Sequence, residues 1–303
     1  MDTECINMQK SRGSFAKLRP QIDADIEKYR KADITIRVCD AEGRPVPGAH
    51  IELRQDSHAF DFGCNCLKLG GLGADNERYE SALARLFNLI TTTFCLSVIE
   101  PNPGEWRFAE GSREIFRRPP PDRAVNFAHK YGLRLKGQPL LAGSWFPAWA
   151  KGFTNDEVRA LYSDYFARVA ERYGHTFDIF DVVNEAFCHT KFPLYTEECE
   201  YVDWAFREAE KLFSKDVNLE LNEASFVNCG AKADRYYRLA ERILSRGIRL
   251  DSIGFQYHQF NEWEGRRHIN CEYLPPEEIY ANYHRFSELG IPLYISEVTI
   301  PSK

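Results

Sequence analysis

Seven short apolar runs separated by helical patterns constrain this chain more than any other feature of its sequence. We interpret the runs as strands, which cover residues 59–65, 88–94, 133–139, 177–185, 217–223, 251–258 and 292–298. The clearest helix follows Thr154, which forms a capping box with Glu157 before apolar residues at helical spacing. Gly247 and Gly290 stand where two later helices should end. Strands that alternate with helices predict a parallel sheet.

An open doubly wound sheet and a closed (β/α)₈ TIM-type barrel both satisfy this alternation. Glycines within residues 70–77 lack the G-x-G-x-x-G spacing of a dinucleotide site, so they do not favour the open sheet. The strand interiors are apolar, whereas polar residues stand at the carboxyl ends: Asn65, Gln138, Asn184, Glu185, Asn222, Glu223, Gln256, His258 and Glu297. Polar groups that converge at one end of the strands predict a barrel with its site on that face.

The chain divides by pattern into residues 1–57 and a barrel over residues 58–303. The first thirty residues are polar, with a weak helical pattern. Residues 34–40 and 49–55 flank a turn rich in proline and glycine, which predicts a β-hairpin.

Composition excludes several classes of function. The net charge is −6, with 39 basic against 45 acidic residues, which argues against nucleic-acid binding. No apolar run is long enough to span a membrane. The eight histidines are scattered without metal-ligand spacing, so we expect no metal and no cofactor. Nine cysteines, an odd number, suggest reduced thiols, and the amino terminus does not resemble a signal peptide. The sequence leaves two cellular locations open: the cytoplasm, or secretion directed by a signal peptide that is not part of this chain.

Two glutamates suggest the chemistry. Glu185 ends the fourth predicted strand and Glu297 ends the seventh, so they should face each other across the mouth of a barrel. Retaining glycosidases need two carboxyl groups about 5–5.5 Å apart, one as proton donor and one as nucleophile. For each glutamate alone, the alternative is a structural ion pair with a basic neighbour.

Five segments resemble glycoside hydrolase family 10, the endo-β-1,4-xylanase family. They are FDFGCN at 60–65, EPNPGEWRF at 100–108, DVVNEA at 181–186, IGFQYH at 253–258 and ISEV at 295–298, and the resemblance runs from about residue 58 to the end. It implies that Glu185 is the acid/base and Glu297 the nucleophile that cleaves a polysaccharide or oligosaccharide. It also implies that Asn184 binds the sugar 2-hydroxyl and that His258 orients Glu297. Five further residues are expected to support or bind substrate. They are Gln138, Gln256 and Asn222 and, by stacking on sugar rings, Trp145 and Trp263.

The sequence departs from the family at three strand ends. At strand 3, Gln138, Ala142 and Gly143 replace a histidine, a tryptophan and a second histidine of the family motif. After strand 2 the family's E-N-x-x-K is absent, and Thr299 stands where the family has an aspartate. These changes favour a different β-glycan or a substituted xylan over plain xylan. They also leave a non-catalytic glycan-binding barrel as the alternative.

No eighth strand is recognisable after the seventh. A barrel left open would expose unpaired backbone groups on its first and last strands. The segment 34–55 or a second copy of the chain, which would make a homo-oligomer, could cover that edge.

Overall fold

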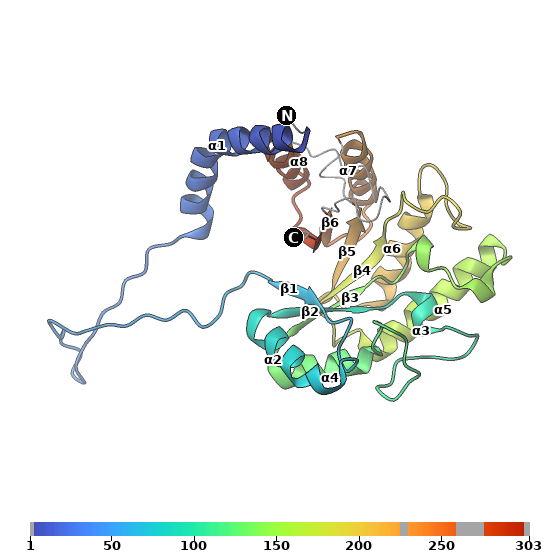
Figure 1. The fold of residues 1–303 in the computed structure, drawn as a ribbon, viewed down its shortest axis with the longest axis horizontal. Coiled ribbons are helices and arrows are strands. Elements are labelled where there is room, and N and C mark those ends of the chain that lie inside the picture. The colour runs from blue at the N-terminus through green and yellow to red at the C-terminus, as the bar shows by residue number, and fades with distance from the viewer. Residues whose placement is uncertain (1–2, 225–229, 259–275, 300–303) are drawn as a thin grey trace. The chain divides into compact units, whose positions relative to one another are not determined.

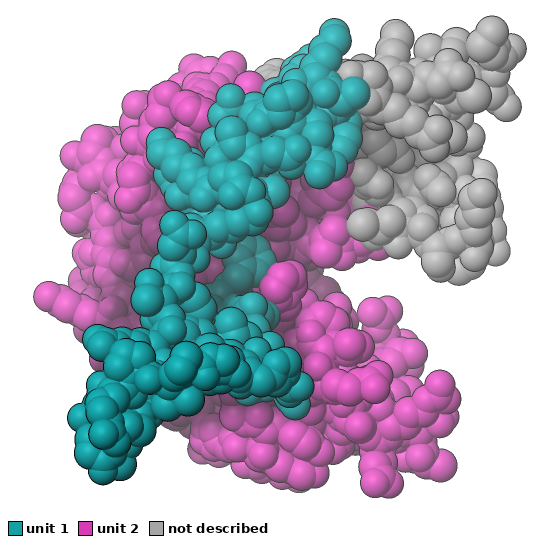
Figure 2. All heavy atoms as spheres, turned by 90° about the vertical axis from the view of Figure 1, so that its left-hand side faces the viewer, with its two compact units in different colours: residues 1–60, 273–280 teal, residues 61–272, 281–303 magenta. Residues whose placement is uncertain are grey.

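The structure, a computed structural model, describes residues 3–224, 230–258 and 276–299. The chain forms two compact units, coloured separately in Figure 2. The first comprises residues 1–60 with 273–280, and the second comprises residues 61–272 with 281–303.

The first unit contains the long polar helix α1 (Thr3–Arg30) and an extended segment after it. The hairpin predicted for residues 34–40 and 49–55 does not form, and this prediction is wrong. One isolated antiparallel bridge pairs Cys39, in the first arm, with Pro45 in the turn, and residues 49–55 form no strand. Prolines lack the N–H that a ladder requires, and a lone two-stranded ribbon is marginal without a surface to bury. The predicted division of the chain after residue 57 stays a prediction.

Seven parallel strands form the sheet of the second unit, in the order in which they occur along the chain. They are β1 (Gly63–Asn65), β2 (Leu89–Thr93), β3 (Arg134–Gln138), β4 (Ile179–Asn184), β5 (Asn218–Glu223), β6 (Ser252–His258) and β7 (Leu293–Thr299). The strands fan out side by side and the sheet curls (Figure 1), as in part of a TIM barrel. The predicted fold class is therefore confirmed, and β1 is the one strand markedly shorter than expected.

Helices lie between the strands. They are α2 (Asn76–Leu86), α3 (Leu96–Ile99), α4 (Pro121–Tyr131), α5 (Asn155–Tyr173), α6 (Glu200–Leu212), α7 (Gly230–Ser245) and α8 (Pro276–Ser287), with short 3₁₀ turns η1 (Gly73–Asp75), η2 (Gly143–Trp145) and η3 (Ala148–Ala150). Helix α4 packs on β2 and β3, and α6 packs on β4 and β5. Among the described residues, no helix combines the length and apolar character needed to cross a bilayer.

Local sequence signals explain where the helices begin and end. The predicted capping box of α5 is confirmed, because the Thr154 hydroxyl accepts from the Glu157 N–H and the Glu157 carboxylate accepts from the Thr154 N–H. Gly247 and Gly290 follow α7 and α8 with φ of 64° and 74°. That left-handed conformation costs glycine little, so both residues can end a helix there.

The two edge strands each have one partner within the described part of the chain. β1 pairs with β2 and β7 pairs with β6. On β7 the side chains of Ile295 and Val298 are 59% and 57% exposed. Cover of this edge by a second copy of the chain stays a prediction.

Candidate active site

The strand register brings the predicted polar residues together at the carboxyl ends of the strands. Neighbouring strands pair at these positions: Thr93 with Gln138, Asn184 with Asn222, Gln256 with Glu297, and His258 with Thr299. The last three of these pairs follow a shift in register, which lies after Asp181 in the β4–β5 pair and after Phe255 in the β6–β7 pair. Parallel pairing therefore collects side chains that are far apart in sequence.

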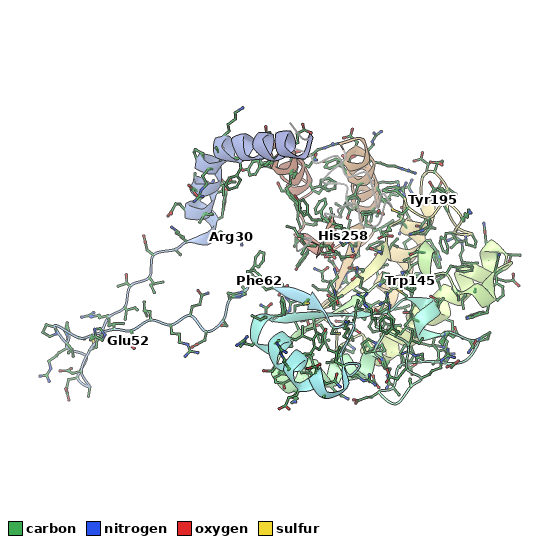
Figure 3. The ribbon with its side chains drawn as sticks, in the orientation of Figure 1. Arg30, Glu52, Phe62, Trp145, Tyr195 and His258 are labelled. Atoms are coloured by element: carbon green, nitrogen blue, oxygen red, sulfur yellow. The ribbon has the colours of Figure 1, made fainter. Side chains whose placement is uncertain are left out.

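A cavity of about 550 Å³ runs along the sheet, from Leu89 and Ile179 at the beginnings of β2 and β4 to the carboxyl ends of the strands. Eight of the residues discussed from sequence line it: Asn65, Gln138, Trp145, Asn184, Glu185, His258, Glu297 and Thr299. Figure 3 labels Trp145, from η2 after β3, and His258, at the end of β6. Asn222 and Gln256 are buried beside the cavity and reach it through hydrogen bonds. Trp263 lies outside the described residues.

Three donor groups surround the carboxylate of Glu297. Its Oε1 accepts hydrogen bonds from the amide of Gln138 and from Asn222 Nδ2, the latter at 3.0 Å. Its Oε2 lies 3.3 Å from His258 Nε2. Because an ionised carboxylate only accepts hydrogen bonds, three donors match that form of the group. One oxygen is thus fixed by two donors, while the other retains accepting capacity.

Thr299 supports His258 without adding a charge. His258 Nδ1 lies 2.9 Å from the Thr299 hydroxyl. When Nε2 donates toward Glu297, Nδ1 accepts from this hydroxyl, so a neutral imidazole satisfies both contacts. The replacement of the family's aspartate therefore preserves the orientation of the ring but removes a negative charge from behind it.

Glu185 occupies a strained backbone position directly after β4. Its φ is 56°, in the left-handed region that non-glycine residues seldom adopt, at a typical cost of about 1–2 kcal/mol. Its N–H donates to Asn222 O at 3.0 Å. The carboxylate lies 3.2 Å from Gln256 Nε2 and 3.1 Å from His189 Nε2. Strain of this kind clusters at functional sites, where the surroundings hold it in place.

A buried ion cluster lies beneath the site. Lys136 Nζ is 2.8 Å from Asp181 Oδ1 and also contacts Glu220, and these side chains are at most 5% exposed. Burial raises the pKa of the Asp181 carboxyl; the charge of Lys136 opposes this shift, and the neighbouring charge of Glu220 adds to it. Asn222 Nδ2 donates to Asp181 at 3.2 Å and thereby links the cluster to Glu297.

Gly254 leaves room for this polar network. A Cβ at this position would lie 2.6 Å from Glu220 Oε1 and 2.9 Å from Asn222 Oδ1. Asn222 Oδ1 also accepts from the Ser296 hydroxyl at 2.6 Å. The glycine of β6 thus allows polar side chains from its two neighbouring strands to meet.

Glu223 fixes the backbone that follows Glu185. It is fully buried, and its Oε1 accepts from the Ala186 N–H at 2.5 Å. Burial raises the pKa of the Glu223 carboxyl well above its ordinary value of 4.5, with the nearby charge of Glu185 acting in the same direction. The protonated form is therefore the one that suits the fold.

We expect Glu223→Gln to change how stability depends on pH. A raised folded-state pKa contributes stability that is fully present below the ordinary value of 4.5 and is lost as the pH rises through the raised value. The amide cannot ionise but can still accept from Ala186. The parent should therefore lose more unfolding free energy than the variant between about pH 5 and about pH 8 in urea titrations. Parallel pH dependences of the two proteins would contradict this expectation.

The aromatic wall of the cavity includes Trp145. Its ring is half-buried, and the guanidinium carbon of Arg118 lies 5.0 Å from the ring centroid. Trp149, from η3, donates its indole N–H to Glu100 O at 2.9 Å. Trp149 therefore packs against the loop after β2.

Three site residues were not identified from sequence. His189 and Arg118 lie in loops, where no periodic pattern marks a residue that points into a cavity. Lys136 carried a signal, because a lysine in the middle of a buried strand requires buried acids, and Asp181 and Glu220 lie in the middle of β4 and β5.

Comparison with known proteins identifies the family. The model of glycosyl hydrolase family 10 matches residues 60–303. Endo-1,4-beta-xylanase B of Thermotoga neapolitana is 26% identical over 233 residues, which cover 74% of this chain and 61% of the relative. The anti-sigma-I factor RsgI6 of Acetivibrio thermocellus is 24% identical over 283 residues, 91% of this chain and 33% of that relative.

A solved structure agrees with this relationship. Native xylanase 10B from Thermotoga maritima superposes with a TM-score of 0.62 at 26% identity, covering 80% of this chain and 71% of that one. The chain spans about three-fifths of the length of the first xylanase relatives that it matches. Together with a family model that covers the whole sheet unit, these findings show that the chain belongs to glycosyl hydrolase family 10.

Proposed function

We propose that this chain is the barrel of a retaining glycoside hydrolase that cleaves a β-1,4-linked glycan of the xylan class. One observation carries the proposal: a single cavity is lined by Glu185, directly after β4, and by Glu297 on β7. Each carboxylate has its own set of hydrogen-bond donors. Relatives named as endo-1,4-beta-xylanases support the substrate class.

Glu297 is the proposed nucleophile. Two donors hold its Oε1, whereas His258 is the one side chain of the described residues recorded at Oε2, which leaves a lone pair of Oε2 for attack. Attack on the anomeric carbon forms a glycosyl ester as the bond to the leaving oxygen breaks. Asn184, which lines the same cavity, is the proposed partner of the sugar 2-hydroxyl.

Glu185 is the proposed acid and base. It transfers its proton to the leaving glycosidic oxygen, and then removes a proton from the water that hydrolyses the ester. Its strained backbone and its contacts with Gln256 and His189 fix where the proton is delivered.

The altered end of strand 3 reshapes the sugar-binding wall. A Cβ on Gly143 would lie 2.8 Å from the His189 Cβ and 2.9 Å from the Phe192 Cβ. The loop after β4 thus packs against a position where the family has a histidine side chain, and that loop supplies the imidazole of His189 instead. This rearrangement supports a substrate other than unsubstituted xylan.

The test is hydrolysis of a panel of defined β-glycans, with the anomeric form of the first products followed by NMR. We expect oligosaccharides from a xylan-class substrate, released first as the β-anomer. Release of the α-anomer first would overturn the retaining mechanism, and an absence of products from every glycan would overturn the enzymatic proposal.

We expect His189→Ala to impair protonation of the leaving group. The loss of a hydrogen bond to a charged partner should lower kcat/KM about tenfold on a glycan, which needs a proton donor. An activated aryl glycoside, whose leaving group departs without a proton, should be affected much less. The exposed His175→Ala is the matched control, and an equal loss on both substrates would exclude this role for His189.

The second candidate is a glycan-binding barrel without turnover. The replaced residues at the end of strand 3 favour it, and so does the relative named as an anti-sigma factor, which aligns with 91% of the chain. This candidate predicts binding in calorimetry, with no product from any glycan, and binding that is unchanged by Glu185→Gln.

A further inference from the structure

We propose that Arg118 forms an anion-binding subsite of the cavity and that the glycan bound there carries a uronic acid. This inference deepens the proposed function and rests on it. Arg118 lines the same cavity of about 550 Å³ as Glu185, Glu297 and Trp145. A guanidinium in that position can pair with a sugar carboxylate through two parallel hydrogen bonds.

The loop after β2 fixes the backbone of Arg118. Residues Ile115 and Arg118 form an antiparallel bridge, in which the Arg118 N–H donates to Ile115 O at 2.9 Å. Arg117 within this turn has a φ of 58°. The side chain of Arg107, 1% exposed, donates to the carbonyls of Arg118, Arg113 and Val98 at 2.7–2.8 Å. Two independent constraints, a tight turn and a buried arginine, therefore hold Arg118 at the cavity.

The charge of Arg118 is not compensated within the part of the chain that the structure describes. Its recorded side-chain hydrogen bond goes to the carbonyl of Arg117 at 2.7 Å, and its buried Nε has no acceptor. The other strong cation at the cavity, Lys136, is paired with Asp181. Arg118 is thus a cation at the wall of a binding cavity without a carboxylate of its own.

The surroundings of Arg118 also leave its charge uncompensated. Partial burial lowers the pKa of its guanidinium, although an arginine stays charged in proteins. The nearby Cys95 thiol offers no counter-charge, because burial raises the pKa of that thiol. A carboxylate arriving with a substrate would therefore meet a partly desolvated cation, where an ion pair is stronger than in water.

Trp145 orients the guanidinium and adds a surface for a sugar ring. The Arg118 guanidinium carbon is 5.0 Å from the Trp145 ring centroid, a cation–π contact. Stacking on a ring restrains the plane of a guanidinium and leaves its N–H edge available. Apolar faces of sugar rings pack on such indoles. The pair therefore fits a sugar that presents both a ring face and a carboxylate.

The experiment compares a glucuronic acid-substituted xylan with the same polymer after reduction of its carboxyls to alcohols. We expect the parent to cleave the acidic polymer with about tenfold higher kcat/KM than the reduced one. Arg118→Gln should remove that preference by slowing cleavage of the acidic polymer alone. Arg118→Lys should retain part of it, and the exposed Arg207→Gln is the matched control.

Equal cleavage of both polymers by the parent, or an equal loss on both in Arg118→Gln, would overturn the proposal and assign Arg118 a purely structural role. If the parent cleaves neither polymer, the proposed hydrolysis fails, and affinity electrophoresis with the same two polymers tests the subsite. Retardation by the acidic polymer that Arg118→Gln abolishes would support it. Retardation that does not distinguish the polymers would overturn it.

Discussion

Glu297→Ala should abolish hydrolysis of every substrate, because it removes the carboxylate that is proposed to form the glycosyl ester. We expect kcat/KM to fall by about a thousandfold or more, which corresponds to ~4 kcal/mol of lost transition-state stabilisation. The loss should be as large on an activated aryl glycoside as on a glycan, since both need a nucleophile. Added azide should enter the space left by the carboxylate and restore cleavage, with a glycosyl azide of inverted configuration as the product.

A control separates chemistry from folding. Glu171 is exposed on α5, away from the strand ends, and Glu171→Gln should leave kcat/KM unchanged. Far-UV circular dichroism of each variant reports whether the fold survives. Cleavage of the aryl glycoside by Glu297→Ala at the rate of the parent would refute the assignment of the nucleophile.

Lys136→Met should destabilise the fold more than any other single change considered above. It leaves Asp181 and Glu220 buried side by side without their cation, and breaking a buried ion pair from one side typically costs about 3–5 kcal/mol. The pKa of Asp181 is already raised by burial, and loss of Lys136 removes the opposing influence. The carboxyls then need protons to stay buried, so the loss of stability should grow as the pH rises.

Urea unfolding of the parent and of Lys136→Met at about pH 5 and about pH 8 tests whether the loss of stability grows with pH. Adding Asp181→Asn and Glu220→Gln to Lys136→Met should recover part of the lost stability, because no buried charge is then left unpaired. The exposed Lys215→Met is the control for the loss of a lysine. If Lys136→Met lowers the urea midpoint by the same amount at both pH values, lost packing and not unpaired charge dominates the effect.

The sheet was predictable from sequence because hydrophobic runs bounded by polar residues mark strands well. β2 to β7 lie within two residues of their predicted limits. The hairpin failed because two runs of plausible strand composition had no hydrophobic surface to pack against, and Pro45 and Pro47 weakened any ladder between them. Local patterns cannot report whether such a surface exists.

The site was predictable where its residues belong to strands. Parallel pairing brings the carboxyl ends of β6 and β7 together. The exact partners, Gln256 with Glu297 and His258 with Thr299, depend on a register shift after Phe255 that the sequence does not reveal. The contributions of the loops were not predictable. His189 follows Glu185 by four residues, but its contact depends on how the loop packs on Gly143. The position of Arg118 depends on a turn whose backbone carbonyl accepts a hydrogen bond from the buried Arg107.

The hydrogen bonds of Glu297 connect strands that are not adjacent in the sheet. Through Gln138 and Asn222, one carboxylate oxygen on the edge strand β7 is tied to β3 and to β5, strands that are not its neighbours. The proposed nucleophile thus also links three strands of the sheet. In the proposed reaction its carboxylate loses its charge on forming an ester with a sugar, and these hydrogen bonds weaken. The links from β7 to β3 and β5 should therefore be weakest in the covalent intermediate.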